Sequence, residues 1–204
     1  MAGIALRVGL KTHDDDVRSQ ARRLVIFRET PLAGAFVIEL EPHRDERGWF
    51  ARSFCERELA EHGLPTRFPQ SNLSFNRHAG TLRGMHYNRA PFAESKLVRP
   101  ASGAIFDVIV DLRQGSPTRF RSFGVELTAA QGSALFVPAG FAHGFVTLLD
   151  DTAVHYQMGE FFNADAARGF RWNDPKFSLA WPREPSVIAA RDAGYPDFVE
   201  GQDG

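Results

Sequence analysis

The sequence predicts an all-β fold, because its apolar residues recur at every second position in several short runs. The clearest runs are residues 34–40, 103–112 and 122–128, and a period of two is typical of strands with two distinct faces. Gly, Pro and Asn residues separate these runs and indicate turns. Patterns typical of helices are few, and many short strands with few helices favour a sandwich or a barrel.

The run at residues 103–112 defines its two faces most clearly. One face is apolar throughout, with Phe106, Val108, Val110 and Leu112. The opposite face mixes apolar and acidic residues: Ile105, Asp107, Ile109 and Asp111. The two aspartates are either carboxylates of a pocket or the polar side of the strand, and the sequence leaves both interpretations open.

Two segments have helical character. In residues 53–63, Ser53 followed by Glu56 forms a capping-box pattern, and Gly63 suits the C-terminal end of a helix. Residues 186–194 are expected to form a second short helix or a turn. Both helices are expected at the periphery of the strands.

The length of 204 residues predicts one domain with a substantial core. Residues 1–23 are polar and charge-mixed, and we expect them to form a mobile N-terminal extension. Residues 24–204 are expected to form the single domain. The formal net charge of −1 argues against a nucleic-acid surface driven by bulk charge.

The expected location is the cytoplasm. No apolar run approaches the roughly 18–20 residues of a membrane span, and no basic head precedes an apolar segment as in a signal peptide. The single cysteine, Cys55, cannot form an internal disulfide, which suits a reducing compartment. Neither a membrane nor a nucleic acid is an expected partner.

Residues 132–145 read GSALFVPAGFAHGF, a G-x5-P-x-G-x2-H pattern. Pro138 and Gly140 suit a tight turn between two strands, after which His143 lies on the second strand. This spacing resembles the second motif of the cupin superfamily. The resemblance implies a cupin-type jelly-roll barrel around a central pocket.

The first cupin motif bears on metal binding. In metal-binding cupins it supplies two histidines separated by one residue and then a glutamate. The matching stretch here is GMHYNRAPFAES, in which Asn88 takes the second histidine position and Glu94 lies further on. His86 and His143 with one carboxylate would make a poor metal cage, so no metal is expected.

His86 is therefore either a proton-transfer base or a hydrogen-bonded structural histidine. Arg83, Lys96 and Arg99 surround it in sequence and form either a site for an anionic substrate or a solvated basic face. Strict strand alternation would put Arg83 and His86 on opposite faces. Either Gly84 permits a bulge that reorients one of them, or Arg83 reaches the pocket from its rim.

Several further stretches carry a more specific resemblance. They read DERGWF, QSNLS, GTLRGMHYN, KLVRPASGAIFDVIVDLRQGSPT, LFVPAGFAHGFVTL, YQMGEFF and RGFRWNDPKFSLAWP. In this order and spacing, over residues 30–195, the chain resembles the dTDP-4-dehydrorhamnose 3,5-epimerase family. The resemblance implies metal-independent, cofactor-free enzymes that act as homodimers with an exchanged N-terminal strand.

The resemblance also implies roles for particular residues. His86 matches the catalytic base, and Asp192 matches the aspartate that orients it. Tyr156 matches the general acid, and Lys96 matches the lysine that faces the enolate oxygen. The positions that match substrate-binding residues are Arg47, Trp49, Gln70, Asn72, Arg83 and His143.

The implied reaction is epimerisation of a 4-keto-6-deoxyhexose nucleotide at C3, C5 or both, with conversion of dTDP-4-dehydro-6-deoxyglucose to dTDP-4-dehydrorhamnose as the leading expectation. A ketone at C4 makes the neighbouring C–H bonds acidic, so one base and one acid suffice. Departures from the family pattern at Arg52, Gln157, Phe161 and Phe162 leave the nucleotide and the sugar open. Whether C3, C5 or both are inverted depends on how the sugar is repositioned and where the acid lies, which the sequence does not reveal. Two alternatives stand: an epimerase of another nucleotide sugar at one carbon only, and a non-enzymatic cupin that binds a sugar nucleotide.

Overall fold

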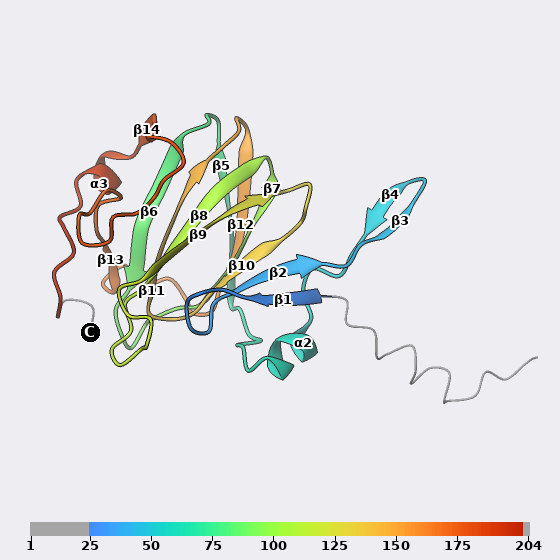
Figure 1. The fold of residues 1–204 in the computed structure, drawn as a ribbon, viewed down its shortest axis with the longest axis horizontal. Coiled ribbons are helices and arrows are strands. Elements are labelled where there is room, and N and C mark those ends of the chain that lie inside the picture. The colour runs from blue at the N-terminus through green and yellow to red at the C-terminus, as the bar shows by residue number, and fades with distance from the viewer. Residues whose placement is uncertain (1–24, 202–204) are drawn as a thin grey trace, which may run out of the picture.

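A computed structural model describes residues 25–201, which form two sheets and a small projecting hairpin (Figure 1). The helices within these residues are short: α2 (Glu56–Glu61) and α3 (Ala190–Ala193). The all-β expectation is therefore confirmed. The expected N-terminal extension, residues 1–23, lies outside the described residues. No helix of the described part is long and apolar enough to cross a bilayer.

The first sheet has the order β1–β2–β10–β7–β12–β5, with antiparallel neighbours throughout. Its strands are β1 (Val25–Glu29), β2 (Phe36–Leu40), β5 (Gln70–Asn76), β7 (Lys96–Ser102), β10 (Ala134–Val137) and β12 (Thr152–Met158). Most neighbouring strands in this sheet are far apart in the sequence, so the sheet brings together side chains from distant segments.

The second sheet has the order β13–β6–β11–β8–β9, and β14 pairs with β6 in parallel. Its strands are β6 (Thr81–Asn88), β8 (Ala104–Asp111), β9 (Ser122–Thr128), β11 (Phe141–Thr147), β13 (Ala167–Gly169) and β14 (Val187–Ile188). The turn expected around Pro138 and Gly140 joins β10 of the first sheet to β11 of the second.

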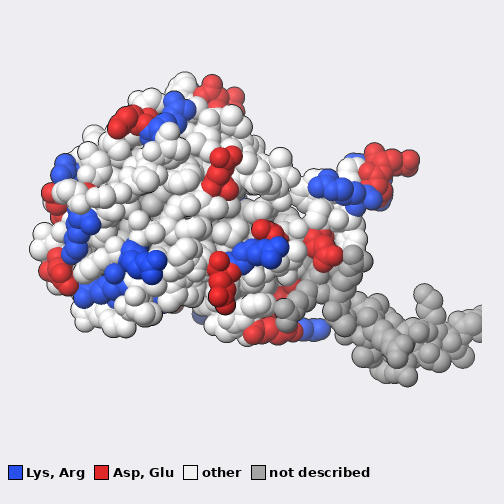
Figure 2. Space-filling model, in the orientation of Figure 1, with Lys and Arg blue, Asp and Glu red and all other residues white. Residues whose placement is uncertain are grey.

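A third, two-stranded element consists of β3 (His43–Asp45) and β4 (Gly48–Phe50). This hairpin extends away from both sheets (Figure 1), and all of its strand residues are exposed. Its tip carries charges of both signs (Figure 2). Within one chain, the side chains of the hairpin strands are therefore largely open to solvent.

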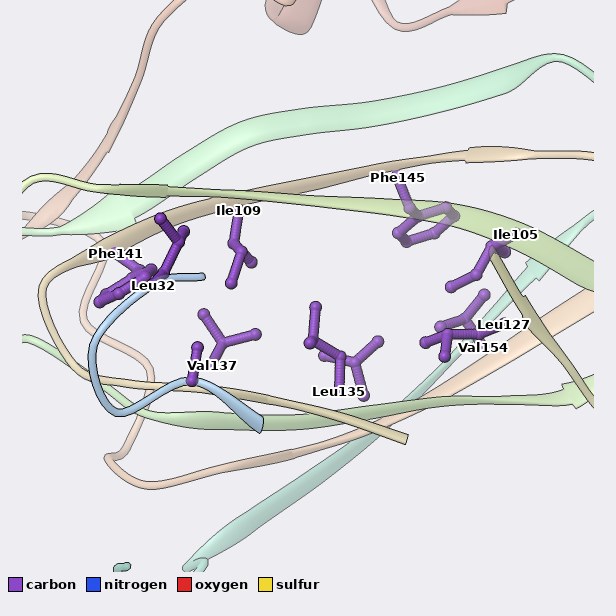
Figure 3. Packing of buried hydrophobic residues seen from close by; sticks show 11 residues of the cluster. Leu32, Ile105, Ile109, Leu127, Leu135, Val137, Phe141, Phe145 and Val154 are labelled. Atoms are coloured by element: carbon purple, nitrogen blue, oxygen red, sulfur yellow. The ribbon is translucent and has the colours of Figure 1, made fainter. Parts of the chain in front are cut away.

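The main core lies between the two sheets. Leu135, Val137 and Val154 from the first sheet face Ile105 and Ile109 from the second (Figure 3). The burial of β8 follows the two faces read from the sequence. Its apolar face, with Val108 and Val110, packs into a separate cluster on the other side of the second sheet.

That outer cluster holds the C-terminal segment against the second sheet. Phe170, Phe177 and Phe198 pack on one another with ring centroids 4.7 to 5.7 Å apart. Phe170 also exchanges backbone hydrogen bonds with Met85 of β6, at 3.2 and 3.3 Å. Burial of these rings is favourable by area alone, and it fixes α3 beside β6.

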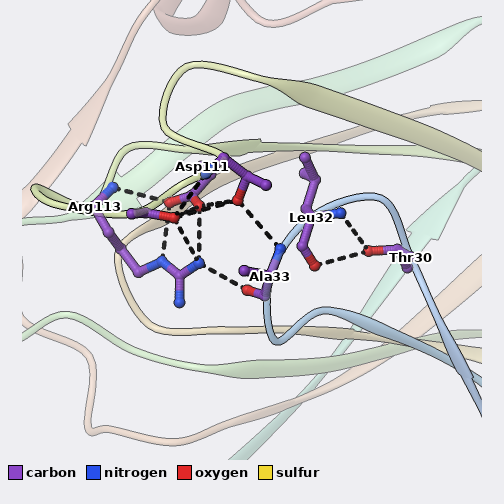
Figure 4. Close-up of polar contacts among 7 residues, drawn as sticks. Thr30, Leu32, Ala33, Asp111 and Arg113 are labelled. Carbon is purple, nitrogen blue, oxygen red and sulfur yellow. Dashed lines mark hydrogen bonds and ion pairs between the residues drawn. The ribbon is translucent and has the colours of Figure 1, made fainter.

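A polar network surrounds Asp111, the last residue of β8 (Figure 4). Arg113 donates to both carboxylate oxygens at 2.8 and 2.9 Å, and Thr118 donates at 2.7 Å. Burial would raise the pKa of Asp111, but these donors and Ser116 outweigh it and lower the pKa from 3.8 to about 2. Asp111 is thus a structural residue, because Arg113 also donates to the carbonyl of Ala33 and ties the β1–β2 turn to the end of β8.

The helical expectations were only partly right. Helix α2 begins at Glu56 with Cys55 as its N-cap, and no side chain caps it. The capping-box prediction at Ser53 is wrong, because Ser53 lies in an extended segment whose carbonyl accepts a hydrogen bond from Arg99 at 2.7 Å. Residues 186–194 divide into β14 and the single turn α3.

Candidate active site

A cavity of about 360 Å³ lies beside the main core, between the two sheets. Phe145 and Tyr156 belong to both the core and the cavity wall. Seven of the ten residues expected at the site line this cavity: Asn72, Arg83, His86, Lys96, His143, Tyr156 and Asp192. They come from β5, β6, β7, β11, β12 and α3, so the fold brings six separate elements to one place.

A bulge in β6 places Arg83 and His86 on the same cavity. In the pairing with β11, His86 lies opposite His143 and Arg83 lies opposite Phe145, so β6 carries one extra residue. Gly84 occupies this bulge with φ of +125°, a conformation that L side chains rarely adopt. Of the two alternatives for Arg83, the bulge at Gly84 is confirmed.

Close backbone packing also requires glycine at this bulge. A Cβ atom on Gly84 would lie 2.5 Å from the Cα of Gly144 and 2.9 Å from the carbonyl oxygen of His143. The strands therefore approach too closely for any side chain at position 84. The position of His86 depends on this approach.

Asp192 anchors both the bulge and His86. Its Oδ1 accepts a hydrogen bond from His86 Nε2 at 2.9 Å, and its Oδ2 accepts one from the Gly84 N–H at 3.1 Å. Burial raises the pKa of Asp192, but the hydrogen bond and charge of His86, the Gly84 N–H and Arg191 together lower it. Asp192 is therefore an ionised acceptor at neutral pH.

The pairing with Asp192 leaves one nitrogen of His86 available. With Nε2 donating to the carboxylate, Nδ1 carries the free lone pair. Within residues 25–201, Nδ1 makes no hydrogen bond. The His86 side chain is 40% exposed at the cavity wall, so a ligand can reach Nδ1.

Tyr156 lies on β12, opposite Val98 of β7 and Asn72 of β5. Burial raises the pKa of its phenol, the charge of Glu94 raises it further, and the charge of Arg83 partly opposes both. The phenol therefore keeps its proton at neutral pH, as a proton donor must.

Lys96 and Glu94 form a buried ion pair in the cavity wall. Lys96 Nζ lies 3.0 Å from Glu94 Oε1, and each residue is only 8% exposed. Glu94 was noted in the sequence only as a weak metal ligand. The remaining oxygen, Oε2, is buried and has no hydrogen-bond partner within the described residues.

His143 pairs with Asp107, which the sequence left unassigned. His143 Nε2 donates to Asp107 Oδ1 at 2.6 Å, and Asp107 is fully buried behind the histidine. Asp107 does not itself line the cavity, but it contacts the cavity through His143, which does. Its second oxygen, Oδ2, is also buried without a partner in residues 25–201.

Three of the expected site residues lie outside this cavity. Arg47 and Trp49 are on the projecting hairpin, where Arg47 pairs with Asp45. Gln70 lies at the start of β5, and its side-chain oxygen accepts a hydrogen bond from the N–H of Phe162, a residue of the cavity wall. Arg99 of the sequence-level basic cluster is also elsewhere, bound to the carbonyl of Ser53.

The other residues of the cavity wall were not among the expected site residues. Tyr195 packs edge-on against His86 with ring centroids 5.9 Å apart, and its hydroxyl is buried without a partner among the described residues. The remaining wall residues are Tyr87, Asn88, Glu94, Phe145, Met158, Phe162, Ala167, Arg168, Ala189 and Arg191. Of these, Asn88 and Glu94 were noted in the first cupin motif and Phe162 as a departure from the family pattern.

The cavity does not assemble a metal-binding group. Within residues 25–201, no three His, Cys, Asp or Glu side chains come together in a way that would hold a metal ion. His86 and His143 each direct Nε2 to a carboxylate of their own. The donor set therefore suits proton transfer better than metal coordination.

Comparison with known proteins establishes the family. The model of the dTDP-4-dehydrorhamnose 3,5-epimerase family matches residues 29–200. The chain belongs to the dTDP-4-dehydrorhamnose 3,5-epimerase family. The epimerase of Methanothermobacter thermautotrophicus is 42% identical to it over 177 residues, which cover 85% of this chain and 95% of the relative.

Solved structures of family members have the same fold. The Bacillus anthracis dTDP-4-dehydrorhamnose 3,5-epimerase, with TDP and PPi bound, matches with a TM-score of 0.82 and 38% identity, covering 85% of this chain and 99% of that one. ChmJ, a 3′-monoepimerase from Streptomyces bikiniensis in complex with dTDP-quinovose, matches with a TM-score of 0.77 and 29% identity, covering 83% and 86%. The cupin-type fold expected from the sequence is thus confirmed.

This epimerase-family chain departs from the expected pattern near the cavity mouth. Phe162 lines the cavity and is 67% exposed, while Phe161 beside it is 59% exposed. Arg52 lies away from the cavity and pairs with Glu58 of α2, with 3.4 Å between Nη1 and Oε1. Within one chain, the departure at Arg52 therefore forms a contact with helix α2 and does not reach the cavity.

Proposed function

We propose that this chain is a cofactor-independent epimerase of a dTDP-linked 4-keto-6-deoxyhexose, converting dTDP-4-dehydro-6-deoxyglucose to dTDP-4-dehydrorhamnose. The observation that carries the proposal is a single cavity lined by an Asp-anchored imidazole, a protonated phenol and a lysine. Family membership supports the substrate class.

His86 is the base of the proposed reaction. Its free Nδ1 takes the proton from a carbon next to the C4 ketone, and the electron pair of the C–H bond moves into a C–C double bond as the carbonyl becomes an enolate. Asp192 fixes the tautomer that leaves Nδ1 free and stabilises the imidazolium that forms. One carboxylate thus both orients the His86 ring and stabilises the positive charge that forms on it.

Tyr156 is the acid. When the phenol returns a proton to the face opposite the one that lost it, the carbon inverts. The positive charge of Arg83 lowers the pKa of the phenol, against the effect of burial. The same charge would help to stabilise the phenolate left after proton transfer. A binding protein without catalysis needs no such pair of acid and base.

Lys96 acts on the developing negative charge. Its ammonium, placed against the C4 oxygen, stabilises the enolate more than the ketone, and only such differential stabilisation accelerates the reaction. Arg83 offers a planar guanidinium suited to diphosphate oxygens. Phe162 at the cavity mouth offers an exposed aromatic face to a nucleobase.

We also propose that the active form is a homodimer with an exchanged N-terminal strand, as the family resemblance implies, and that the β3–β4 hairpin of the exchanged part extends into the partner's cavity. In one chain, Arg47 at the hairpin lies outside the cavity with its side chain 85% exposed. The backbone of the hairpin projects from the sheets (Figure 1), and its strand residues are exposed. Insertion into a second subunit would give Arg47 a diphosphate to bind and cover Trp49.

The test is solvent deuterium incorporation into dTDP-4-keto-6-deoxyglucose, followed by NMR at C3 and C5 separately. Exchange at both carbons is expected of a 3,5-epimerase, and exchange at one carbon would indicate a monoepimerase. The His86→Ala variant should show no exchange at either carbon. Exchange by His86→Ala at the wild-type rate would contradict the assignment of the base.

A further inference from the structure

The proposed reaction gives no task to Glu94, a charged group of the cavity. Glu94 pairs with Lys96 through Oε1, while Oε2 is buried and lacks any hydrogen-bond partner within the described residues. Buried carboxylate oxygens are almost always satisfied, so an orphaned one calls for an explanation. Glu94 also lines the cavity itself, where a ligand can supply the missing donor.

The backbone around Glu94 fixes its position on the acid side of the cavity. The Gly159 N–H donates to the carbonyl of Ser95 at 2.8 Å and ties the residue after Glu94 to the end of β12. Lys96 lies opposite Met158 of the same strand, two residues from Tyr156. Glu94 is close enough to Tyr156 for its charge to act on the phenol.

The chemistry of the substrate narrows the choice of donor. A 4-keto-6-deoxyhexose joined to a nucleotide through C1 has only two free hydroxyls, on C2 and C3. The C3 hydroxyl is the one next to the C4 oxygen, which Lys96 faces in the proposed reaction. An acceptor held beside the Lys96 ammonium is therefore best placed for the C3 hydroxyl.

We propose that Glu94 is a specificity-determining residue whose Oε2 accepts a hydrogen bond from the C3 hydroxyl while Lys96 faces the C4 oxygen. The ion pair then recognises an α-hydroxy ketone, with the acceptor opposite the hydroxyl and the cation opposite the carbonyl. This assignment rests on the proposed epimerase function and goes beyond it by naming the sugar hydroxyl that the cavity requires.

The two half-reactions should depend on Glu94 to different extents. When His86 takes the C3 proton, C3 becomes planar and its hydroxyl lies in one plane with the C4 oxyanion, as an enediolate. When His86 takes the C5 proton, the double bond forms between C4 and C5, and C3 stays tetrahedral. The Glu94–Lys96 pair matches the planar enediolate, so it favours proton removal at C3 over C5.

Glu94→Gln isolates the contact. The amide must turn its oxygen toward the Lys96 ammonium, because an NH2 group cannot accept from it. The NH2 group then occupies the place of Oε2 and replaces an acceptor by a donor. Both enolates place negative charge on the C4 oxygen, so a change in the effective charge of Lys96 alters exchange at C3 and at C5 alike. The ratio of C3 to C5 exchange is therefore insensitive to that change.

Glu58→Gln is the matched control. Glu58 is also 8% exposed and lies on α2, outside the cavity, where it accepts from the Val25 N–H at 3.1 Å and pairs with Arg52. The substitution makes the same chemical change at the same burial. It should leave the ratio of C3 to C5 exchange at the wild-type value.

The experiment measures deuterium entry at C3 and C5 of dTDP-4-keto-6-deoxyglucose. In Glu94→Gln, the ratio of C3 to C5 exchange should fall about tenfold, the effect of one hydrogen bond to a charged group. An equal loss at both carbons, or no loss, overturns the assignment of Glu94 alone. Wild-type protein that exchanges neither carbon overturns the proposed function instead.

A second measurement serves if Glu94→Gln does not fold. Wild-type protein is assayed for C5 exchange with the 3-deoxy and the 2-deoxy analogues of the substrate. The 3-deoxy analogue should raise KM about tenfold, because Oε2 again lacks a donor, while the 2-deoxy analogue should bind as the parent sugar does. Equal KM values for the two analogues would refute the contact.

Discussion

His86 Nε2 donates a 2.9 Å hydrogen bond to Oδ1 of Asp192, across 106 residues of sequence. The same carboxylate accepts from the Gly84 N–H inside the β6 bulge. One residue of a single-turn helix therefore fixes both the ring of His86 and the strand irregularity that brings Arg83 beside it. The C-terminal segment thus holds β6 in place.

Asp192→Asn should lower deuterium exchange at both carbons about 100-fold or more, because an amide can leave His86 in the wrong tautomer. The measurement is the exchange rate under saturating substrate. Asp165→Asn, at an exposed site, is the control for loss of a carboxylate and should exchange as the wild type does. An unchanged rate in Asp192→Asn would show that Asp192 does not orient the base.

Tyr156→Phe should separate proton removal from inversion. Loss of the phenol removes the acid but leaves His86 intact, so deuterium should still enter from the His86 side while formation of the inverted sugar falls about 100-fold or more. NMR reads both the label and the configuration in one sample. Equal loss of label and inversion would contradict separate roles for the two residues.

The pH dependence of Tyr156 has a definite sign. Burial raises the pKa of the phenol above its usual 10.0, so the acid stays protonated through neutral pH and is lost only as pH rises beyond 10. The inversion rate of the wild type should therefore show no decline caused by this group below pH 10. A tyrosine-dependent decline near pH 8, absent in Tyr156→Phe, would contradict the observed environment.

Gly84→Ala should destabilise the protein by about 3 kcal/mol or more, because it adds a backbone clash to a strained φ. Gly63→Ala is the matched control: Gly63 also has positive φ, at +68°, but nothing lies within 4 Å of its missing Cβ. That variant should lose only about 1 kcal/mol. Urea unfolding measures both, and equal losses would mean that close packing at Gly84 is unimportant.

A mixing experiment tests the dimer. Arg47→Ala and His86→Ala should each be impaired alone. When the two are co-refolded, a hybrid has one cavity with His86 from one chain and Arg47 from the other, so activity should recover toward one intact site per dimer. If Arg47 served the cavity of its own chain, no hybrid cavity would be complete, and mixing would restore nothing.

Asp111 gives a stability prediction with a defined pH window. A folded pKa of about 2 against 3.8 contributes about 2 kcal/mol of stability above pH 4, which is lost as pH falls through 2. The stability difference between wild type and Asp111→Asn, from urea unfolding, should shrink by that amount between pH 5 and pH 2. The exposed Asp165→Asn should show a much smaller change.

The sequence by itself determined the β architecture and seven of the residues that line the cavity. Alternation in residues 103–112 correctly separated the two faces of β8, because each side chain of a strand points opposite to its neighbours. The family resemblance brought forward His86, Lys96, Tyr156 and Asp192, all of which line one cavity. Such patterns are local, because each one lies within a single segment of the chain.

Only the tertiary structure decided which groups meet. The pairing of Asp107 with His143 and the packing of Tyr195 on His86 both join different strands or segments. The capping-box pattern at Ser53 failed for the same reason, since a hydrogen bond from distant Arg99 holds that segment extended. Hydrogen bonds between segments depend on the register of strands far apart in the chain, and no local pattern of residues encodes that register.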